Sequence, residues 1–324
     1  MDTRRFLYRL SAVLVIVAMA IGLAPVLPNQ AMAQDKDTFH FVFVPKLVHP
    51  WYDDVKRGAD ASIAEFAKKG ITVTYDWDAP PSADVVLHTQ RIEAAIAKKP
   101  DALFVSCLDA AADKPLIEEA RNQGIPVLSF DTPCPDTAVE AFIGRYDYED
   151  DGAEVAEMLA KAINYKGEVA ILAGSPGAAN HKQRVAGFKK AMAQYPDITI
   201  VAEEFDNDDV ERAVNLTASI LQAHPNLAGI YGCNASNPIG AGRALVEAGK
   251  VGQVVLIGMD DLPDMVSFVR DGTALAMSVQ NVSEIGYWGI IHAVALAQGH
   301  TVPVIHDTGS LLVTKDMLDT YKAK

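Results

Sequence analysis

Cysteine and basic residues are both scarce in this sequence of 324 residues. It contains three cysteines, and 28 lysine and arginine residues against 42 aspartate and glutamate residues, which gives a formal net charge of −14. A chain this acidic is repelled by nucleic-acid phosphates and by anionic lipid surfaces, so we expect no nucleic-acid partner. The cysteines are odd in number and have no spacing typical of metal ligands.

Long apolar runs are missing after residue 33, and the common catalytic motifs are missing throughout. The eight histidines form no His-Glu-x-x-His pattern, so no zinc site of that kind is predicted. The segment 173–177 lacks the first glycine of a Gly-x-Ser-x-Gly nucleophile elbow, and Gly240-Ala241-Gly242 lacks the third glycine of a dinucleotide-binding loop. The sequence therefore predicts a protein that is not an enzyme and needs neither a cofactor nor a metal.

The first 33 residues are typical of a secretory signal. Three arginines precede an apolar run over 10–27, and Ala31-Met32-Ala33 supplies the small residues of a cleavage site. A transmembrane anchor is the alternative, but Pro25 and Pro28 interrupt the apolar run near the minimum spanning length. We expect cleavage after Ala33 and a soluble, periplasmic mature protein.

Two of the cysteines lie close behind apolar runs. Cys107 and Cys134 could therefore lie near each other at one edge of a sheet, and a disulfide is compatible with an oxidising compartment. Two buried, unpaired thiols are an equally good interpretation. The sequence does not decide between them.

From residue 39 onward, short apolar runs alternate with longer amphipathic segments. The predicted strands are 39–45, 71–77, 102–107, 126–131, 141–144, 168–173, 198–205, 227–232, 254–259 and 274–279. The predicted helices are 52–69, 83–98, 112–123, 149–163, 181–194, 209–223, 238–248, 262–271 and 283–298. Apolar strands that each precede a helix are typical of parallel sheets covered on both faces, which is the doubly wound α/β fold. The charged segment 145–151 favours a break into two lobes.

In such a fold, ligands bind where loops meet at the carboxyl ends of the strands. The side chains predicted there are polar, planar or aromatic: Lys46, His49, Trp51, Tyr52, Asp131, Asn180, His181, Arg184, Asn234, Asp260 and Gln280. Carboxylates accept hydrogen bonds from hydroxyl groups, arginine donates in a fixed fork, and an aromatic ring covers the C–H face of a sugar. We expect these residues to bind a small polyhydroxylated molecule without transforming it.

Some of these residues have a purely structural alternative. His49 and Asn180 could cap the helices that follow them, and Lys46 could be a solvated charge. Trp51 or Tyr52 could belong to the core. Asp131, which ends the apolar strand 126–131, has no such structural alternative, because burying its carboxylate without a partner would be costly.

The segments that carry these residues resemble the periplasmic sugar-binding proteins of the ribose-binding type, which are the receptors of ABC importers. They are 44–52, where His-Pro-Trp-Tyr stands in the place of Asn-Pro-Phe-Phe, and then 128–131, 184–188, 232–234, 257–260 and 280–286. The resemblance covers the chain from Phe39 onward. It implies a type I periplasmic binding protein, in which two lobes clamp a sugar. It also implies that the protein is a monomer and delivers the sugar to a membrane permease.

The resemblance also implies discontinuous lobes and a hinge of three crossovers. The expected lobes are 38–144 plus 281–306, and 145–280 plus 307–324, with crossovers near 144–145, 281 and 304–307. Closure of this hinge would bring both lobes onto the ligand. Regulators of the lactose-repressor type share the core, but they begin with a basic helix-turn-helix, and an export signal stands in that position here.

Three departures from the family pattern bear on the ligand. Thr132 stands where ribose binders have arginine, and Lys46 and His49 add basic groups to the first loop. The segment 44–48 is similar to relatives that bind autoinducer-2, a furanosyl signalling molecule. A pentose, hexose or polyol is the first expectation, a furanosyl signal the second, and a secreted carbohydrate-modifying enzyme the third.

Overall fold

The computed structural model describes residues 36–321, and the predicted signal and cleavage site lie outside them. The first of two sheets has the strand order β11-β5-β4-β3-β1-β2, and its strand pairs are parallel. Its strands are β1 (Thr38–Val44), β2 (Thr72–Trp77), β3 (Ala102–Val105), β4 (Val127–Phe130), β5 (Ala141–Gly144) and β11 (Ile305–Asp307).

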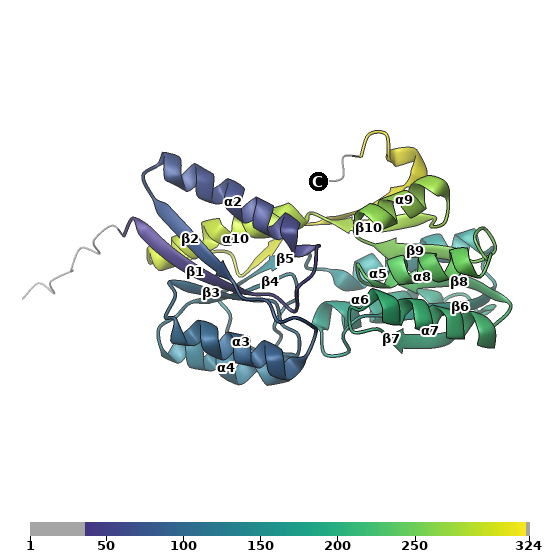
Figure 1. The fold of residues 1–324 in the computed structure, drawn as a ribbon, viewed down its shortest axis with the longest axis horizontal. Helices are drawn as coiled ribbons and strands as arrows, with labels where there is room; N and C mark the ends of the chain where they lie inside the picture. The colour runs from purple at the N-terminus through teal and green to yellow at the C-terminus, as the bar shows by residue number, and fades with distance from the viewer. Residues whose placement is uncertain (1–35, 322–324) are drawn as a thin grey trace, which may run out of the picture. The chain divides into compact units, whose positions relative to one another are not determined.

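Helices cover both faces of the first sheet because successive side chains of a strand point to opposite faces. Phe39, Phe41 and Phe43 of β1 pack toward α2 (Tyr52–Lys68) and α10 (Val282–Ala297). Val42 and Val44 of the same strand pack toward α3 (Val85–Ala97) and α4 (Ala110–Asn122). Figure 1 shows these two helix pairs on opposite sides of the strands.

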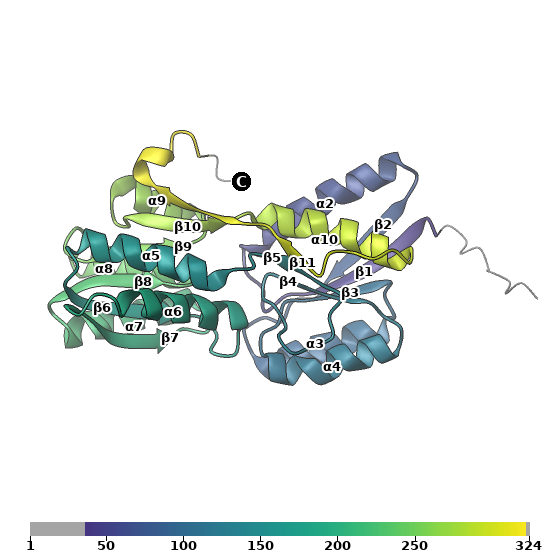
Figure 2. The same cartoon turned by 180° about the vertical axis from the view of Figure 1, so that it is seen from behind.

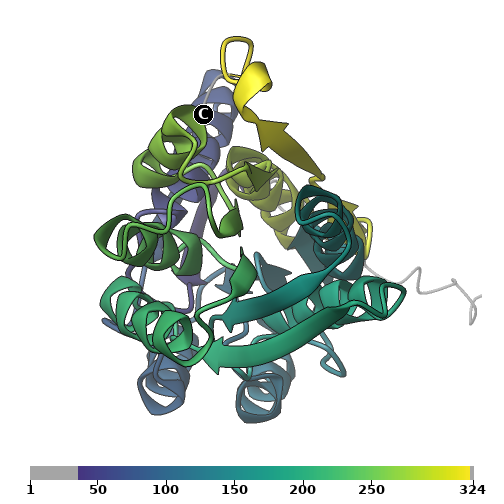
Figure 3. The ribbon, with the colours of Figure 1, turned by 90° about the vertical axis from the view of Figure 1, so that its right-hand side faces the viewer.

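The second sheet repeats this arrangement with the order β12-β10-β9-β8-β6-β7. Its strands are β6 (Gly167–Ala173), β7 (Ile198–Phe205), β8 (Leu227–Gly232), β9 (Val255–Met259), β10 (Ala276–Gln280) and β12 (Ser310–Thr314), and β12 is antiparallel to β10. One face is covered by α5 (Tyr148–Ala162) and α6 (Ala179–Met192), and the other by α7 (Val210–Ala223), α8 (Asn237–Glu247) and α9 (Pro263–Asp271). Figures 2 and 3 show the helices on both sides of this sheet. The predicted α/β fold with two parallel-sheet lobes is confirmed.

The chain passes from one sheet to the other at three places. It leaves the first sheet after Gly144 and enters α5, returns at Asn281 from β10 into α10, and crosses again at Thr308 and Gly309 between β11 and β12. Residues from Asp37 onward form one compact unit. We refer to the first sheet with its four helices as the first lobe, and to the second sheet with its five helices as the second lobe.

Two elements near the C-terminus, β11 and β12, were not among the ten predicted strands. Each is short and lies at the edge of its sheet: β11 is Ile-His-Asp, and β12 has an apolar run of only three residues, Leu311 to Val313. Among residues 36–321, no helix has both the length and the apolar character needed to cross a membrane.

Helices α5 and α6 touch each other through their backbones. A Cβ atom on Gly152 of α5 would lie 2.0 Å from the carbonyl oxygen of Arg184, and one on Gly187 of α6 would lie 1.9 Å from that of Glu149. No side chain fits at either position. This close packing places Asp151 of α5 beside Arg184 of α6.

Candidate functional site

The carboxyl ends of strands from both lobes surround one cavity. About 350 Å³ in and around the cavity is not filled by protein atoms, and this figure includes space open to solvent. All eleven residues predicted from the sequence line it: Lys46, His49, Trp51, Tyr52, Asp131, Asn180, His181, Arg184, Asn234, Asp260 and Gln280. Leu47, Asp208 and Ala235 line it as well. The rule that ligand sites lie at strand ends therefore found residues that the fold brings together.

Asp131, which directly follows β4, is the centre of the polar network in the first lobe. Its Oδ2 accepts hydrogen bonds from Tyr52 Oη (2.8 Å), Ser106 Oγ (2.7 Å) and Thr132 Oγ1 (3.3 Å). Lys46 Nζ lies 3.4 Å from the same oxygen, and both side chains are buried. Oδ1 receives no hydrogen bond from the described residues, so it remains available to a ligand.

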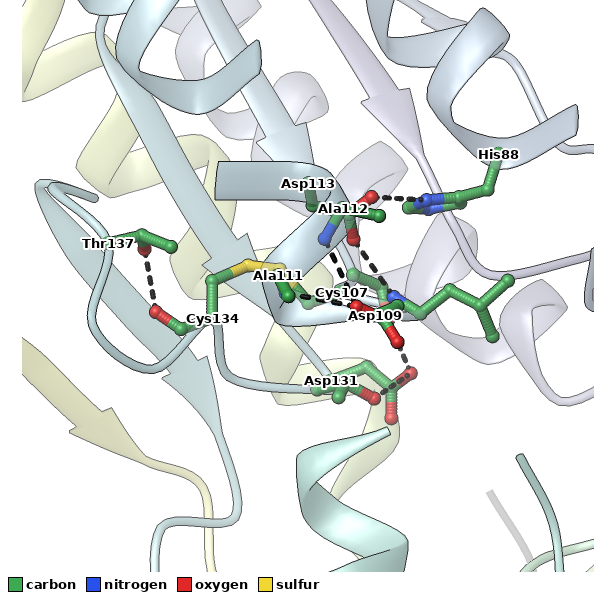
Figure 4. Close-up of a disulfide and its surroundings, with 12 residues drawn as sticks. His88, Cys107, Asp109, Ala111, Ala112, Asp113, Asp131, Cys134 and Thr137 are labelled. Carbon is green, nitrogen blue, oxygen red and sulfur yellow. Dashed lines mark hydrogen bonds and ion pairs between the residues drawn. A yellow bond between two sulfur atoms is a disulfide. The ribbon is translucent and has the colours of Figure 1, made fainter. Parts of the chain in front are cut away.

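A disulfide joins the two loops that support Asp131. Cys107 follows β3 and Cys134 follows β4, and the two are bonded to each other (Figure 4). The backbone N–H of Cys107 also donates to the carbonyl oxygen of Thr132 (3.3 Å). The structure thus decides between the two interpretations of these cysteines, and the third cysteine, Cys233, is buried and unpaired.

The two aromatic residues of the first loop have different environments. Tyr52 belongs to the core, where its ring lies 5.7 Å from that of Trp77 and 6.1 Å from that of Phe130, and only its hydroxyl group serves Asp131. Trp51 is also buried, but its Nε1 has no hydrogen-bond partner among the described residues. The Trp51 indole N–H acts on Asp260, whose pKa it lowers, so it is a donor at that side of the cavity.

Arg184 contributes a buried positive charge from α6. Its Nη1 donates to the carbonyl oxygen of Cys233 (3.2 Å), and its guanidinium group lies 4.8 Å from the centre of the Tyr148 ring. Nε and Nη2 have no hydrogen-bond partner among the described residues. Burial lowers the pKa of Arg184, but Asp151 and other neighbours raise it above its usual value, so the group stays charged.

Asp260 occupies the end of β9, and Gln280 occupies the end of the adjacent strand β10. Gln280 Nε2 donates to Asp260 Oδ1 (3.1 Å), whereas Gln280 Oε1 is buried and has no hydrogen-bond partner. Burial raises the pKa of Asp260 to about 6, and the charge of Arg184 offsets only part of this effect. Ionisation of Asp260 is therefore unfavourable in the empty cavity, and a hydrogen-bond donor that enters the cavity would stabilise the ionised form.

Asp208, which follows β7, was missed by the sequence reasoning. It accepts hydrogen bonds from Ser175 Oγ (2.7 Å) and Asn234 Nδ2 (2.7 Å), and its Oδ1 lies 3.9 Å from His181 Nε2. Burial raises the pKa of Asp208, but His181 and Lys46 lower it by more, so the carboxyl group is ionised. Burial and Lys46 lower the pKa of His181, which keeps that ring neutral.

His49 connects the two lobes at this cavity. Its Nε2 lies 3.2 Å from Ser236 Oγ, which in turn donates to the carbonyl oxygen of Asp208 (3.0 Å). Its Nδ1 accepts from the backbone N–H of Trp51 (3.2 Å), and burial lowers its pKa. His49 therefore serves both the helix start and the contact between lobes.

Asn180 does not cap α6, because Ala178 occupies the N-cap position and the Asn180 side chain accepts from the next backbone N–H. The capping interpretation of Asn180 is therefore wrong, and the side chain is buried at the cavity.

The cavity holds an unusual concentration of unsatisfied polar groups. Four of the buried side-chain atoms that lack a hydrogen-bond partner among residues 36–321 belong to its lining: Trp51 Nε1, Arg184 Nε, Arg184 Nη2 and Gln280 Oε1. Buried polar atoms are almost always paired, so these atoms indicate hydrogen bonds that a guest can supply, except that Arg184 Nε lies 3.7 Å from Asp151 Oδ2, outside the cavity lining. Within the described residues, no group of three or more His, Cys, Asp or Glu side chains is placed to hold a metal ion.

The chain is similar to proteins that bind sugars and sugar alcohols. The D-ribose/D-allose-binding protein of Pseudomonas aeruginosa is 31% identical over 216 residues, which are 65% of this chain and 67% of that protein. The xylitol-binding protein of Mycolicibacterium smegmatis is 29% identical over 241 residues, which are 73% of this chain and 67% of that protein.

A solved structure agrees over nearly the whole chain. The ABC transporter solute-binding protein of Burkholderia graminis, in complex with D-arabinose, is 33% identical and has a TM-score of 0.82, covering 90% of this chain and 99% of its own. The family described as periplasmic binding protein domain matches residues 41–301, which confirms the resemblance seen in the sequence. This chain therefore belongs to the periplasmic binding protein domain family.

Proposed function

We propose that this protein captures a monosaccharide or polyol in the cavity between its lobes and delivers it to the membrane permease of an ABC importer. The observation that carries this proposal is the set of unpaired donors and acceptors on Trp51, Arg184 and Gln280. A hydroxyl group donates and accepts at once, so a polyol satisfies both kinds of atom. The names of the similar proteins, which refer to ribose, allose, xylitol and arabinose, support the same ligand class.

The proposed mechanism is capture by closure of the lobes. We infer that the two lobes move as two bodies about the three crossovers, with β11 and its Asp307 in the first lobe, so that the boundary expected between 306 and 307 falls after Asp307. The first lobe would present Asp131 and Trp51, and the second would present Arg184, Asp260 and Gln280. Because neither set alone surrounds a guest, the ligand favours the closed form over the open one.

We further propose that the ligand leaves unchanged and that the protein works as a monomer. Asp208 at the cavity is held by Ser175 and Asn234, and the neighbouring His181 is neutral, an arrangement that suits binding. Lys46 is the one feature that favours the second candidate ligand, a furanosyl signalling molecule, because it places a buried ammonium group at the cavity.

A panel of small hydroxylated ligands tests the proposal. The purified mature protein is mixed with pentoses, hexoses, pentitols, tetritols and a furanosyl borate ester, and the melting temperature is recorded for each. A ligand at about 100 times its Kd stabilises the native state by about 2.7 kcal/mol, which gives a clear upward shift. Mass spectrometry of the recovered ligand should show it unaltered. A recovered ligand of changed mass, or no shift with any member of the panel, contradicts the proposal.

The proposed export has its own test. If the signal is cleaved after Ala33, the protein recovered from the periplasmic fraction begins at Gln34 and carries a formal charge of about −16, because Asp2 and three arginines are removed. Intact mass measurement distinguishes this product from the full chain. A membrane-bound protein that keeps residues 1–33 would contradict the cleavage.

A further inference from the structure

The buried guanidinium group of Arg184 lies beside a carboxylate that does not line the cavity. Asp151 is fully buried on α5, and its Oδ2 lies 3.7 Å from Arg184 Nε. Neither of these two atoms has a hydrogen-bond partner among the described residues. The pair is therefore close enough for strong attraction at low dielectric, but it stops short of a hydrogen bond.

Asp151 is itself held in place by residues of the hinge. Its Oδ1 accepts from Arg145 Nε (2.8 Å), in the first crossover, and from Ser310 Oγ (2.7 Å), at the start of β12. The close contact of α5 with α6 through Gly152 keeps Asp151 next to Arg184. The orientation of the carboxylate that faces the cavity arginine thus depends on two of the three crossovers.

Arg145 extends the network to the first lobe. Its Nη1 donates to Asp307 Oδ2 (3.1 Å) at the end of β11, a strand of the first sheet. The other oxygen of Asp307 accepts from the backbone N–H groups of Tyr146 (3.1 Å) and Gly309 (3.0 Å), which lie in the first and third crossovers. A continuous series of charged contacts therefore runs from the first lobe through Arg145 and Asp151 to Arg184.

We propose that Arg145, Asp151 and Asp307 are positioning residues that couple ligand capture at Arg184 to closure of the hinge. Rotation of the lobes turns the backbone at residues 145–147 and 308–309, which changes the distance between Arg145 and Asp307. Release of Arg145 leaves Asp151 Oδ1 held by Ser310 alone, so the carboxylate that orients the guanidinium group of Arg184 is less firmly fixed. Conversely, a ligand that holds Arg184 fixes Asp151 and favours the paired, closed hinge.

This inference rests on the proposed function, since it requires a ligand that contacts Arg184. It goes beyond that function by assigning a role in affinity to three residues that do not line the cavity. Asp307 is the best place to test it, because its side chain is 41% exposed and its carboxylate can be neutralised without emptying the core.

The test compares Arg145→Gln and Asp307→Asn with Arg243→Gln, using the sugar that binds the wild-type protein. Arg243 is the control because it too pairs with more than one carboxylate, Glu211 and Asp264, whereas Arg145 pairs with Asp150, Asp151 and Asp307. Arg243 and both of its partners lie in the second lobe, away from the hinge. Isothermal titration should give a Kd about tenfold higher for Arg145→Gln and about threefold higher for Asp307→Asn, with no change for Arg243→Gln. Asp307→Glu, which keeps the charge, should restore most of the affinity.

A double-mutant cycle separates coupling from a general loss of stability. Asp307→Asn is combined with Arg184→Lys, which keeps the positive charge in the cavity but removes the planar set of N–H donors of the guanidinium group. If the network connects the two positions, the combined increase in Kd should fall short of the product of the single increases by threefold or more. A combined effect equal to that product, or an Arg145→Gln Kd equal to that of the Arg243→Gln control, overturns this inference alone. A wild-type protein that binds no sugar overturns the proposed function and this inference with it.

Discussion

Asp131 and Asp260 occupy equivalent positions in the two lobes. Asp131 is the first residue after β4, which lies between β3 and β5, and Asp260 is the first residue after β9, which lies between β8 and β10. Both have a left-handed backbone conformation, with φ of 57° and 61°. Each strand end turns its carboxylate toward the shared cavity, so the two lobes present the same functional group from opposite sides.

Neutralising either aspartate should abolish most of the affinity while leaving the fold intact. Asn is the suitable replacement, since it tolerates the left-handed conformation and preserves the shape of the side chain. Hydrogen bonds to charged groups contribute about 1.5–3 kcal/mol each, so Asp131→Asn and Asp260→Asn should each raise the Kd by about 100-fold. Isothermal titration measures the change, and circular dichroism checks the fold.

Asp261→Asn is the matched control for this pair of variants. Asp261 directly follows Asp260, but it lies outside the cavity lining and accepts a hydrogen bond from Tyr321 Oη (2.6 Å). The Kd of Asp261→Asn should equal that of the wild type. If Asp131→Asn and Asp260→Asn also bind normally, the ligand does not occupy this cavity.

The stability of the empty protein should depend on pH through Asp260. Its pKa is about 6 in the folded chain and about 3.9 in the unfolded chain, so the folded state holds the proton more tightly. The free energy of unfolding should therefore fall as pH rises from 4 to 6, by about 3 kcal/mol, and then level off. Urea unfolding at several pH values should show wild type and Asp260→Asn converging near pH 4, with the variant more stable at pH 7.

The affinity for the ligand should depend on the protonation of Asp260 in the opposite sense: it should rise with pH where the stability falls. A ligand hydroxyl group donates to the ionised carboxylate, so binding should weaken as pH falls below 6. The pH dependence should be smaller in Asp260→Asn, whose weak binding no longer depends on this proton. An identical pH profile in wild type and variant would show that another group controls it.

Trp51 should report ligand binding through its fluorescence. Trp51→Phe keeps a ring at the cavity but removes the unpaired N–H, so the Kd should rise by about tenfold. The emission change on binding should disappear with it. Trp288→Phe is the control, because that indole donates to Glu284 Oε2 (2.8 Å) on α10 and lies outside the cavity lining. A fluorescence change that survives in Trp51→Phe but is lost in Trp288→Phe would contradict this assignment.

The disulfide should contribute to both stability and affinity. It closes a chain segment with a sequence separation of 27, for which chain entropy gives a stabilisation of about 3.5 kcal/mol. The double variant Cys107→Ser, Cys134→Ser should lose about that much unfolding free energy in urea. Its Kd should also rise, because Ser106 and Thr132, which donate to Asp131, lie in the two loops it joins. Cys233→Ser, at a buried cysteine without a disulfide, shows the cost of a cysteine replacement alone.

Much of the fold could be predicted from the sequence because both faces of its sheets are buried. Strands β3 and β9 are apolar throughout, and β4 is apolar except for the buried Ser129. Clear helix patterns flank these strands, and polar residues begin where the strands end. That abrupt change located Asp131 and Asp260. The same rule applied to β7 would have found Asp208, but the outer position of this strand leaves it only half-buried, and several acidic residues follow it.

Other features depend on contacts that a single sequence does not contain. Whether Cys107 meets Cys134 depends on the register of β3 with β4, in which Val105 lies opposite Ser129. The position of the third crossover, at Thr308 and Gly309, depends on two edge strands of three and five residues. The role of Asp151 behind Arg184 depends on the glycine contact between α5 and α6.

The repeated sheet order has an evolutionary consequence. Because each lobe supplies its own strand end with its own aspartate, substitutions in one lobe alter recognition of one side of the guest and leave the other side unchanged. Ligand specificity can therefore change through substitutions in one lobe, while the contacts that the other lobe makes with the ligand are kept. Lys46 and His49, which lie in the loop after β1, belong to the side of the cavity that the first lobe supplies.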